Sequence, residues 1–171
     1  TQIFLQGRRA GWGMFHSPSC SDLKFVLEDE EKRFMVHIMV VTHGPLAQAM
    51  KESSAMFFGS MADSLTTLGL FPTDSPEGLK DKIADKVKET DDGDGVLIFV
   101  DIFAGSPFNM AAMAIDELKD EHKIQCFTGV NMPVLMEALS SCETMTLDEL
   151  AEDIVSVAKD SIVDVRKSLD I

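Results

Sequence analysis

Cysteine is scarce in this chain. Its 171 residues include three, Cys20, Cys126 and Cys142, and none of them lies in a CxxC pair. An odd count without paired spacing argues against a disulfide framework and against a structural zinc site. We therefore expect a protein of the reducing cytoplasm, with no metal.

Positive charge is also in short supply. Fifteen lysine and arginine residues stand against 29 aspartate and glutamate residues, which leaves a net charge of −14 at pH 7. Nucleic acids and anionic lipids are themselves negative, so we expect the chain to bind no nucleic acid and no lipid surface directly. An electropositive protein partner fits this charge better.

Long hydrophobic runs are missing as well. No apolar stretch approaches the roughly 20 residues of a membrane-spanning helix, and residues 1–34 contain nothing as apolar as the core of a signal peptide. These residues hold the only tryptophan, Trp12, and differ in pattern from the rest of the chain. We interpret residues 1–34 as a leader, either an upstream extension or a remnant of cloning, and residues 35–171 as one domain.

The remaining sequence alternates buried strands with amphipathic helices. Strands are expected at residues 35–43, 64–71, 95–100 and 122–128. Helices are expected at residues 45–58, from a cap at Ser75, from an N-cap at Ser106, from about 133 to 140, and from a cap at Thr146 to about 160. Residues 162–171 form either a final helical turn or a short edge strand.

This alternation predicts an α/β fold with an open, mostly parallel sheet, strand order 2-1-3-4, and helices on both faces. In that order the first and third strands are neighbours, and ligands bind outside the carboxyl ends of the strands where the order reverses. His43 ends the first strand and Asp101 ends the third. The pattern therefore predicts an imidazole and a carboxylate in the same crevice.

The chemistry of these residues favours phosphoryl transfer. An imidazole is nucleophilic through one nitrogen when a carboxylate holds the proton on the other, and Asp101 is placed to do this for His43. Gly105 and Ser106 begin the next helix, where free N–H groups and a hydroxyl suit an anion. Each residue alone has an ordinary explanation as a turn or cap residue, but their convergence favours a nucleophilic His43.

Other candidates lack this convergence. We interpret His37 and His122 as structural or exposed histidines. Residues 91–95 (DDGDG) resemble the start of a calcium loop, but the later ligands are missing, so we interpret them as a turn.

Three segments of the chain resemble the signatures of a known family. Residues 41–47 (VTHGPLA), 100–109 (VDIFAGSPFN) and 129–137 (GVNMPVLME) are similar to those of the mannose-family IIA domain of the bacterial phosphoenolpyruvate-dependent sugar phosphotransferase system. The resemblance runs in order from residue 35 to the C-terminus.

The resemblance implies a phosphotransferase with a phosphohistidine intermediate and no cofactor. His43 would accept the phosphoryl group from the phosphocarrier HPr, with Asp101 as hydrogen-bonding partner and Ser106 near the phosphoryl group. A IIB domain, serving a membrane IIC/IID permease, would receive it next. The implied phosphoryl-binding loop consists of Thr42, Gly44, Gly105 and Asn109.

The resemblance also implies a homodimer that exchanges an antiparallel C-terminal edge strand, for which residues 162–169 are the candidate. Because no IIB sequence comes after the domain, we expect a free-standing IIA protein. Ala104 departs from the family, which often has a second glycine there, and this narrows the backbone freedom of the loop.

Three other functions remain as alternatives. The phosphoryl donor subunit of dihydroxyacetone kinase shares the expected fold, but its third-strand turn usually differs from GSPFN. A hydrolase could use Ser106, His43 and Asp101 as a triad, although the chain has no GxSxG elbow. A flavodoxin-like binding module would need a phosphate-cradling loop after the first strand, where His43 and Pro45 stand instead.

Overall fold

The computed structural model describes residues 34–171, which lie in the second of two compact units of the chain, Arg33–Ile171. Apart from Phe34, the predicted leader lies outside the described residues, as does Cys20. The described sheet consists of β1 (His37–His43), β2 (Thr66–Leu70), β3 (Val96–Val100) and β4 (Ile124–Thr128). Its order is β2-β1-β3-β4 and all three pairings are parallel. The predicted α/β fold and strand order are confirmed.

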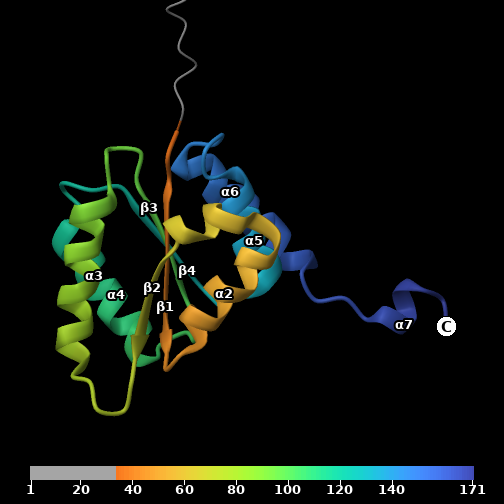
Figure 1. Ribbon diagram of the computed structural model, residues 1–171, viewed down its shortest axis with the longest axis horizontal. Coiled ribbons are helices and arrows are strands. Elements are labelled where there is room, and N and C mark those ends of the chain that lie inside the picture. The colour runs from red at the N-terminus through yellow and green to blue at the C-terminus, as the bar shows by residue number, and fades with distance from the viewer. Residues whose placement is uncertain (1–33) are drawn as a thin grey trace, which may run out of the picture. The chain divides into compact units, whose positions relative to one another are not determined.

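Helices cover both faces of this sheet (Figure 1). On one face lie α3 (Pro76–Thr90) and α4 (Ser106–Leu118), and on the other α2 (Leu46–Phe58), α5 (Met132–Ser141) and α6 (Leu147–Asp160). A short 3-10 segment, η1 (Gly59–Ser64), follows α2, and a single helical turn, α7 (Val165–Ser168), lies near the C-terminus.

The core is divided by the sheet into two layers, and β1 contributes to both. Ile38 and Val40 pack on the α2, α5 and α6 side, whereas Met39 and Val41 pack on the α3 and α4 side. All four side chains are buried. A strand covered on both faces has no solvent-facing positions, which is why its sequence is apolar without alternation.

Two predicted helix caps are confirmed. The Ser75 hydroxyl accepts a hydrogen bond from the Gly78 N–H at 3.0 Å, and Pro76 is the first residue of α3. At α6, Thr146 and Glu149 form a capping box in which each side chain bonds the other residue's backbone N–H. Such caps satisfy donors that have no acceptor inside the helix.

Three predicted strand starts and one predicted cap are wrong, since β1, β2 and β4 begin at residues 37, 66 and 124 rather than 35, 64 and 122. The second strand does not begin at residue 64, because residues 59–64 form η1 before the chain becomes extended at Leu65. The N-cap of α4 is Gly105 rather than Ser106, because the first bond of the helix runs from the Asn109 N–H to the Gly105 carbonyl. Ser106 is therefore the first helical residue, and within residues 34–171 no side-chain hydrogen bond caps the start of α4.

The C-terminal residues 162–171 are all exposed and include α7. Of the two forms expected for this tail, the described chain has the helical turn, and its sheet contains no antiparallel strand. Among residues 34–171, no helix is both long enough and apolar enough to cross a bilayer.

Candidate functional site

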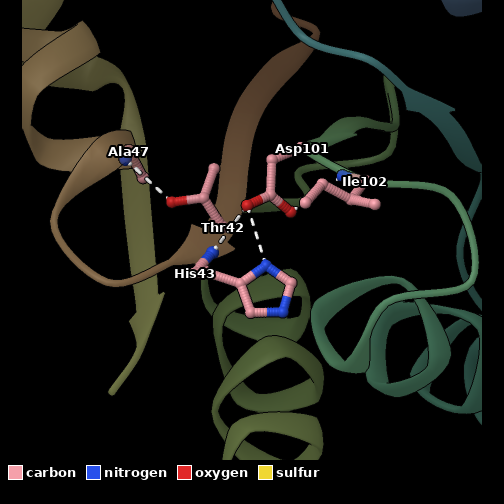
Figure 2. A network of polar contacts seen from close by, with 5 residues as sticks. All are labelled: Thr42, His43, Ala47, Asp101 and Ile102. Atoms are coloured by element: carbon pink, nitrogen blue, oxygen red, sulfur yellow. Dashed lines mark hydrogen bonds and ion pairs between the residues drawn. The ribbon is translucent and has the colours of Figure 1, made fainter. Parts of the chain in front are cut away.

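His43 and Asp101 meet at the carboxyl end of the sheet. Val41 of β1 pairs with Val100 of β3, so the residues that end these strands lie side by side. Asp101 Oδ2 accepts a hydrogen bond from the His43 backbone N–H at 2.8 Å and lies 2.9 Å from His43 Nδ1 (Figure 2). One carboxylate oxygen thus holds both the backbone and the ring of His43.

The environment keeps this carboxylate ionised. Burial acts to raise the pKa of Asp101, but the hydrogen bonds from the backbone and ring of His43 and from the Ile102 N–H outweigh it, and the pKa lies below its usual value. An ionised carboxylate only accepts hydrogen bonds. The proton of a neutral His43 ring therefore sits on Nδ1, and Nε2 keeps its lone pair.

The free nitrogen of the ring is accessible. The His43 side chain is 45% exposed, whereas that of Asp101 is 9% exposed. In Figure 2 the second ring nitrogen points away from the carboxylate. This is the arrangement of an oriented nucleophile with an open approach.

The N-terminus of α4 lies beside the free edge of the ring. A Cβ atom added at Gly105 would be 3.0 Å from His43 Cε1 and 3.6 Å from Nε2. The first N–H groups of a helix lack intrahelical acceptors and carry partial positive charge. Ser106 is exposed in this first turn, and no hydrogen bond joins its hydroxyl to His43 in the structure of residues 34–171. The start of α4 can therefore hold an anionic group beside Nε2.

Two residues of the predicted phosphoryl-binding loop hold the turn after β1. The Thr42 hydroxyl is fully buried and accepts a hydrogen bond from the Ala47 N–H at 2.9 Å, so it fixes the start of α2 beneath the site. The Gly44 N–H donates to the Leu70 carbonyl at 2.8 Å, and its φ of +57° is a conformation that favours glycine. These contacts fix the backbone on which His43 stands.

The other side of the site is a tight loop after β3. Ala104 has a φ of +59°, in the left-handed region that is strained for a residue with a Cβ atom. Asn109 Nδ2 lies 3.4 Å from the Ala104 carbonyl, and the Gly105 N–H donates to the Ile102 carbonyl. Asn109 thus braces the loop that leads into α4.

The remaining candidates have structural partners. His37 Nε2 lies 2.8 Å from Thr66 Oγ1. His122 Nδ1 lies 2.7 Å from Asp91 Oδ2, while Asp91 Oδ1 accepts from two backbone N–H groups of the 91–95 turn. Within residues 34–171, no three His, Cys, Asp or Glu residues gather closely enough to hold a metal ion.

Sequence reasoning missed one residue at the site, Gly69 of β2. A Cβ atom added there would lie 2.4 Å from the Gly44 carbonyl oxygen. A glycine inside a strand often marks a close backbone approach, so a signal was present in the sequence.

Comparison with known proteins places these features in a family. Residues 37–155 match the family model described as "PTS system fructose IIA component". The fructose-specific EIIA component of Bacillus subtilis is 32% identical over 74% of this chain and 84% of its own length. The crystal structure of an EIIA component from Streptococcus agalactiae has a TM-score of 0.71 at 24% identity, covering 78% of this chain and 99% of that one. The crystal structure of a IIA protein associated with the fucose utilization operon of Streptococcus pneumoniae is 28% identical, with a TM-score of 0.65. The match covers 80% of this chain and 97% of that one.

Proposed function

Since this chain belongs to the fructose and mannose family of IIA components of the sugar phosphotransferase system, we propose that it relays phosphoryl groups on His43. The observation that carries this proposal is the pairing of Nδ1 with Asp101, which leaves an exposed Nε2 beside the start of α4. The Nδ1 pairing selects the nitrogen, and the helix start offers N–H groups to the phosphoryl oxygens.

The proposed reaction is a displacement at phosphorus. The Nε2 lone pair attacks the phosphoryl group of phospho-HPr, a new N–P bond forms, and the N–P bond of the donor breaks with its electron pair returning to the donor ring. The proton on Nδ1 stays in place. Asp101 stabilises the positive charge that develops on the ring, and the first turn of α4, with Ser106, binds the phosphoryl oxygens. In the transfer to a IIB domain, a nucleophile of that domain attacks the phosphoryl group on His43, and the N–P bond to Nε2 breaks with its electron pair returning to the His43 ring.

A protein donor and a protein acceptor must both reach His43, and the surface around it suits such contacts. Large apolar side chains are exposed on the segments that surround the ring: Leu46, Phe71, Ile102 and Phe103. Exposed apolar groups of this kind are typical of protein contact surfaces. The net charge of −14 favours an electropositive carrier. We propose HPr and a IIB domain as successive partners, in the cytoplasm, at the membrane permease that the IIB domain serves.

We further propose that the protein is a homodimer that exchanges its C-terminal tails. In the described sheet β4 pairs with β3 and its other edge is unpaired. A hollow of about 300 Å³ lies between β4 and α6, with Phe127, Val130 and Val155 in its lining. The tail carries exposed apolar side chains, among them Ile162, Val163 and Val165. Such a tail, added as a strand to the edge of a second copy, would fill the hollow and cover the edge.

The relay is tested by phosphorylation in vitro. Incubation with phosphoenolpyruvate, enzyme I and HPr should yield an acid-labile phosphoprotein, and His43→Ala should abolish the label. Asp101→Asn should slow labelling about a hundredfold, because an amide no longer favours the proton on Nδ1. His122→Ala is the matched control, since it removes a histidine from an equivalent aspartate pair away from the site. Equal labelling of wild-type and His43→Ala protein would refute the assignment.

A further inference from the structure

The turn that carries the nucleophile is held between two strands. On the β3 side, Asp101 accepts the backbone N–H of His43 at 2.8 Å. On the β2 side, the Leu70 carbonyl accepts the N–H of the next residue, Gly44, also at 2.8 Å. Two successive N–H groups of the turn are thus fixed from opposite sides, and a shift of either strand tip would move the His43 backbone.

Gly69 brings the β2 tip unusually close to this turn. A Cβ atom at residue 69 would lie 2.4 Å from the Gly44 carbonyl oxygen and 3.0 Å from Phe71 Cε2. Even a weak C–H···O contact keeps carbon and oxygen about 3.3 Å apart or more. A methyl group at this position would therefore have to displace the Gly44 carbonyl, which belongs to the turn itself and not to a flexible side chain.

We propose that Gly69 is a positioning residue for the phosphoryl relay: the absence of a side chain there lets the β2 tip close on the Gly44 carbonyl and so sets where His43 stands relative to Asp101 and α4. This inference rests on the proposed function of His43. A displacement of the Gly44 carbonyl would be transmitted to His43 through one peptide unit. Reaction rates are sensitive to such displacements, because a misplacement of about 1 Å can cost about a hundredfold.

Gly69→Ala and Gly78→Ala form a matched pair for the test. Gly78 is in the first turn of α3, and a Cβ atom there would meet only the Ser75 hydroxyl, at an ordinary 3.4 Å. At saturating phospho-HPr, Gly69→Ala should lower the rate of His43 labelling about tenfold or more, with little change in the HPr concentration that gives half the maximal rate. Gly78→Ala should label like the wild type.

A second measurement reports which nitrogen of the His43 ring carries the proton. The ¹⁵N resonances of the imidazole show which nitrogen carries the proton, and in the wild type they should report Nδ1–H. In Gly69→Ala they should report a mixture of the two tautomers, because the ring is no longer aligned with Asp101. A residue with only a structural role would lower the melting temperature and leave both this signature and the rate unchanged.

The outcomes separate this inference from the function on which it rests. If wild-type protein takes no label at all, the relay fails, while the ¹⁵N comparison still tests the role of Gly69. If the wild type is labelled and folded Gly69→Ala matches it in rate and in ¹⁵N signature, the role of Gly69 is refuted. Should Gly69→Ala not fold, the double variant Gly69→Ala/Phe71→Ala is used in its place. It removes the contact of the new methyl group with the Phe71 ring and keeps the contact with the Gly44 carbonyl. Phe71→Ala alone is its reference, and equal rates in that pair would also overturn the inference.

Discussion

Among residues 34–171, two histidines hold ring Nδ1 against an aspartate, and they lie at opposite ends of the parallel sheet. His43 ends β1 and pairs with Asp101, whereas His122 precedes β4 and pairs with Asp91. The two pairs have similar distances, but the His43 side chain is 45% exposed and that of His122 is 15% exposed. The carboxylate orients each ring. Exposure, together with the start of α4 beside Nε2, is what makes His43 the stronger candidate for a nucleophile.

The strained residue of the site gives a prediction about stability. Ala104 has a φ of +59°, and a left-handed conformation costs a residue with a Cβ atom about 1–2 kcal/mol. Glycine carries no such strain but loses more chain entropy on folding. Ala104→Gly should therefore raise the free energy of unfolding by about 0.5–1 kcal/mol, measured by urea denaturation.

Ala112→Gly is the control for that variant, because Ala112 is an exposed residue in the middle of α4. In an ordinary helical conformation the same change should lower the free energy of unfolding by about 1 kcal/mol. Opposite signs for the two variants support the strain at Ala104, and a loss of stability in both would contradict it.

At the level of single residues, the sequence predicted the site residues that lie in a recognisable motif at the end of a strand. His43 ends one apolar strand and Asp101 follows another, and the strand order brings them together. Thr42 was predicted to lie in the phosphoryl-binding loop, but its hydroxyl is buried against the Ala47 N–H. Side-chain direction at the end of a strand depends on how the next turn is closed, and no local pattern encodes that closure. Gly69 was missed for a related reason, since its contact is with a residue of another strand.

At the level of elements, Asp91 fastens two loops at the amino end of the sheet. Its Oδ1 accepts the N–H groups of Gly93 and Gly95, and its Oδ2 lies 2.7 Å from the ring of His122, just before β4. Burial acts to raise the pKa of Asp91, but the bonds from His122 and the two glycines outweigh it and lower the pKa. The turn before β3 is thereby tied to the segment that leads into β4.

Because Asp91 joins these two loops, the variant Asp91→Asn should be less stable than the wild type, by an amount that depends on pH. Near pH 7 the variant should lose about 1–2 kcal/mol in the free energy of unfolding, because an amide bonds His122 less well than a carboxylate does. A carboxyl with a lowered pKa in the folded state stabilises the fold above its unfolded pKa of about 3.9, and that contribution disappears as the pH falls through the folded pKa. The gap between wild type and variant should therefore narrow below about pH 4.

Urea denaturation from pH 7 to pH 3 measures that gap. Asp120→Asn, at an exposed position beyond α4, should leave the free energy of unfolding near the wild-type value throughout. A gap for Asp91→Asn that stays constant or widens on acidification would contradict the role assigned to the carboxylate.

The elements themselves followed from the sequence where burial or capping left a strong pattern. The helices α3 and α6, with their caps at Ser75 and Thr146, lie where the cap residues predicted, and the four strands lie within two residues of the predicted apolar runs. The 3-10 segment η1 was missed, because residues 59–64 have one buried side chain, Ala62, and so carry no apolar period. The C-terminal tail allowed two forms, since its apolar residues contact no core that would select one of them.

At the scale of the whole described unit, residues 34–171, an open strand edge, an apolar hollow and an exposed apolar tail all adjoin β4 and α6. The outer edge of β4 is unpaired in the described sheet, the hollow of about 300 Å³ adjoins it, and α6 leads directly into the exposed tail. The Ile162 side chain is 91% exposed. Exposed apolar residues beside an open strand edge favour association with another chain. In the proposed dimer, the tail of a second copy is the segment that pairs with this edge.

Removal of residues 162–171 tests this association. If the proposed exchange holds, the full chain should behave as a dimer at micromolar concentration in size-exclusion chromatography with light scattering. The truncated chain should then behave as a monomer, because it lacks the segment proposed to pair with the second copy. The double variant Lys167→Ala/Ser168→Ala, which changes two exposed residues of α7 and keeps the apolar ones, should remain dimeric. A truncated chain that still elutes as a dimer would locate the interface elsewhere, and a full chain that is monomeric at these concentrations would mean that the tail and the hollow do not join two copies.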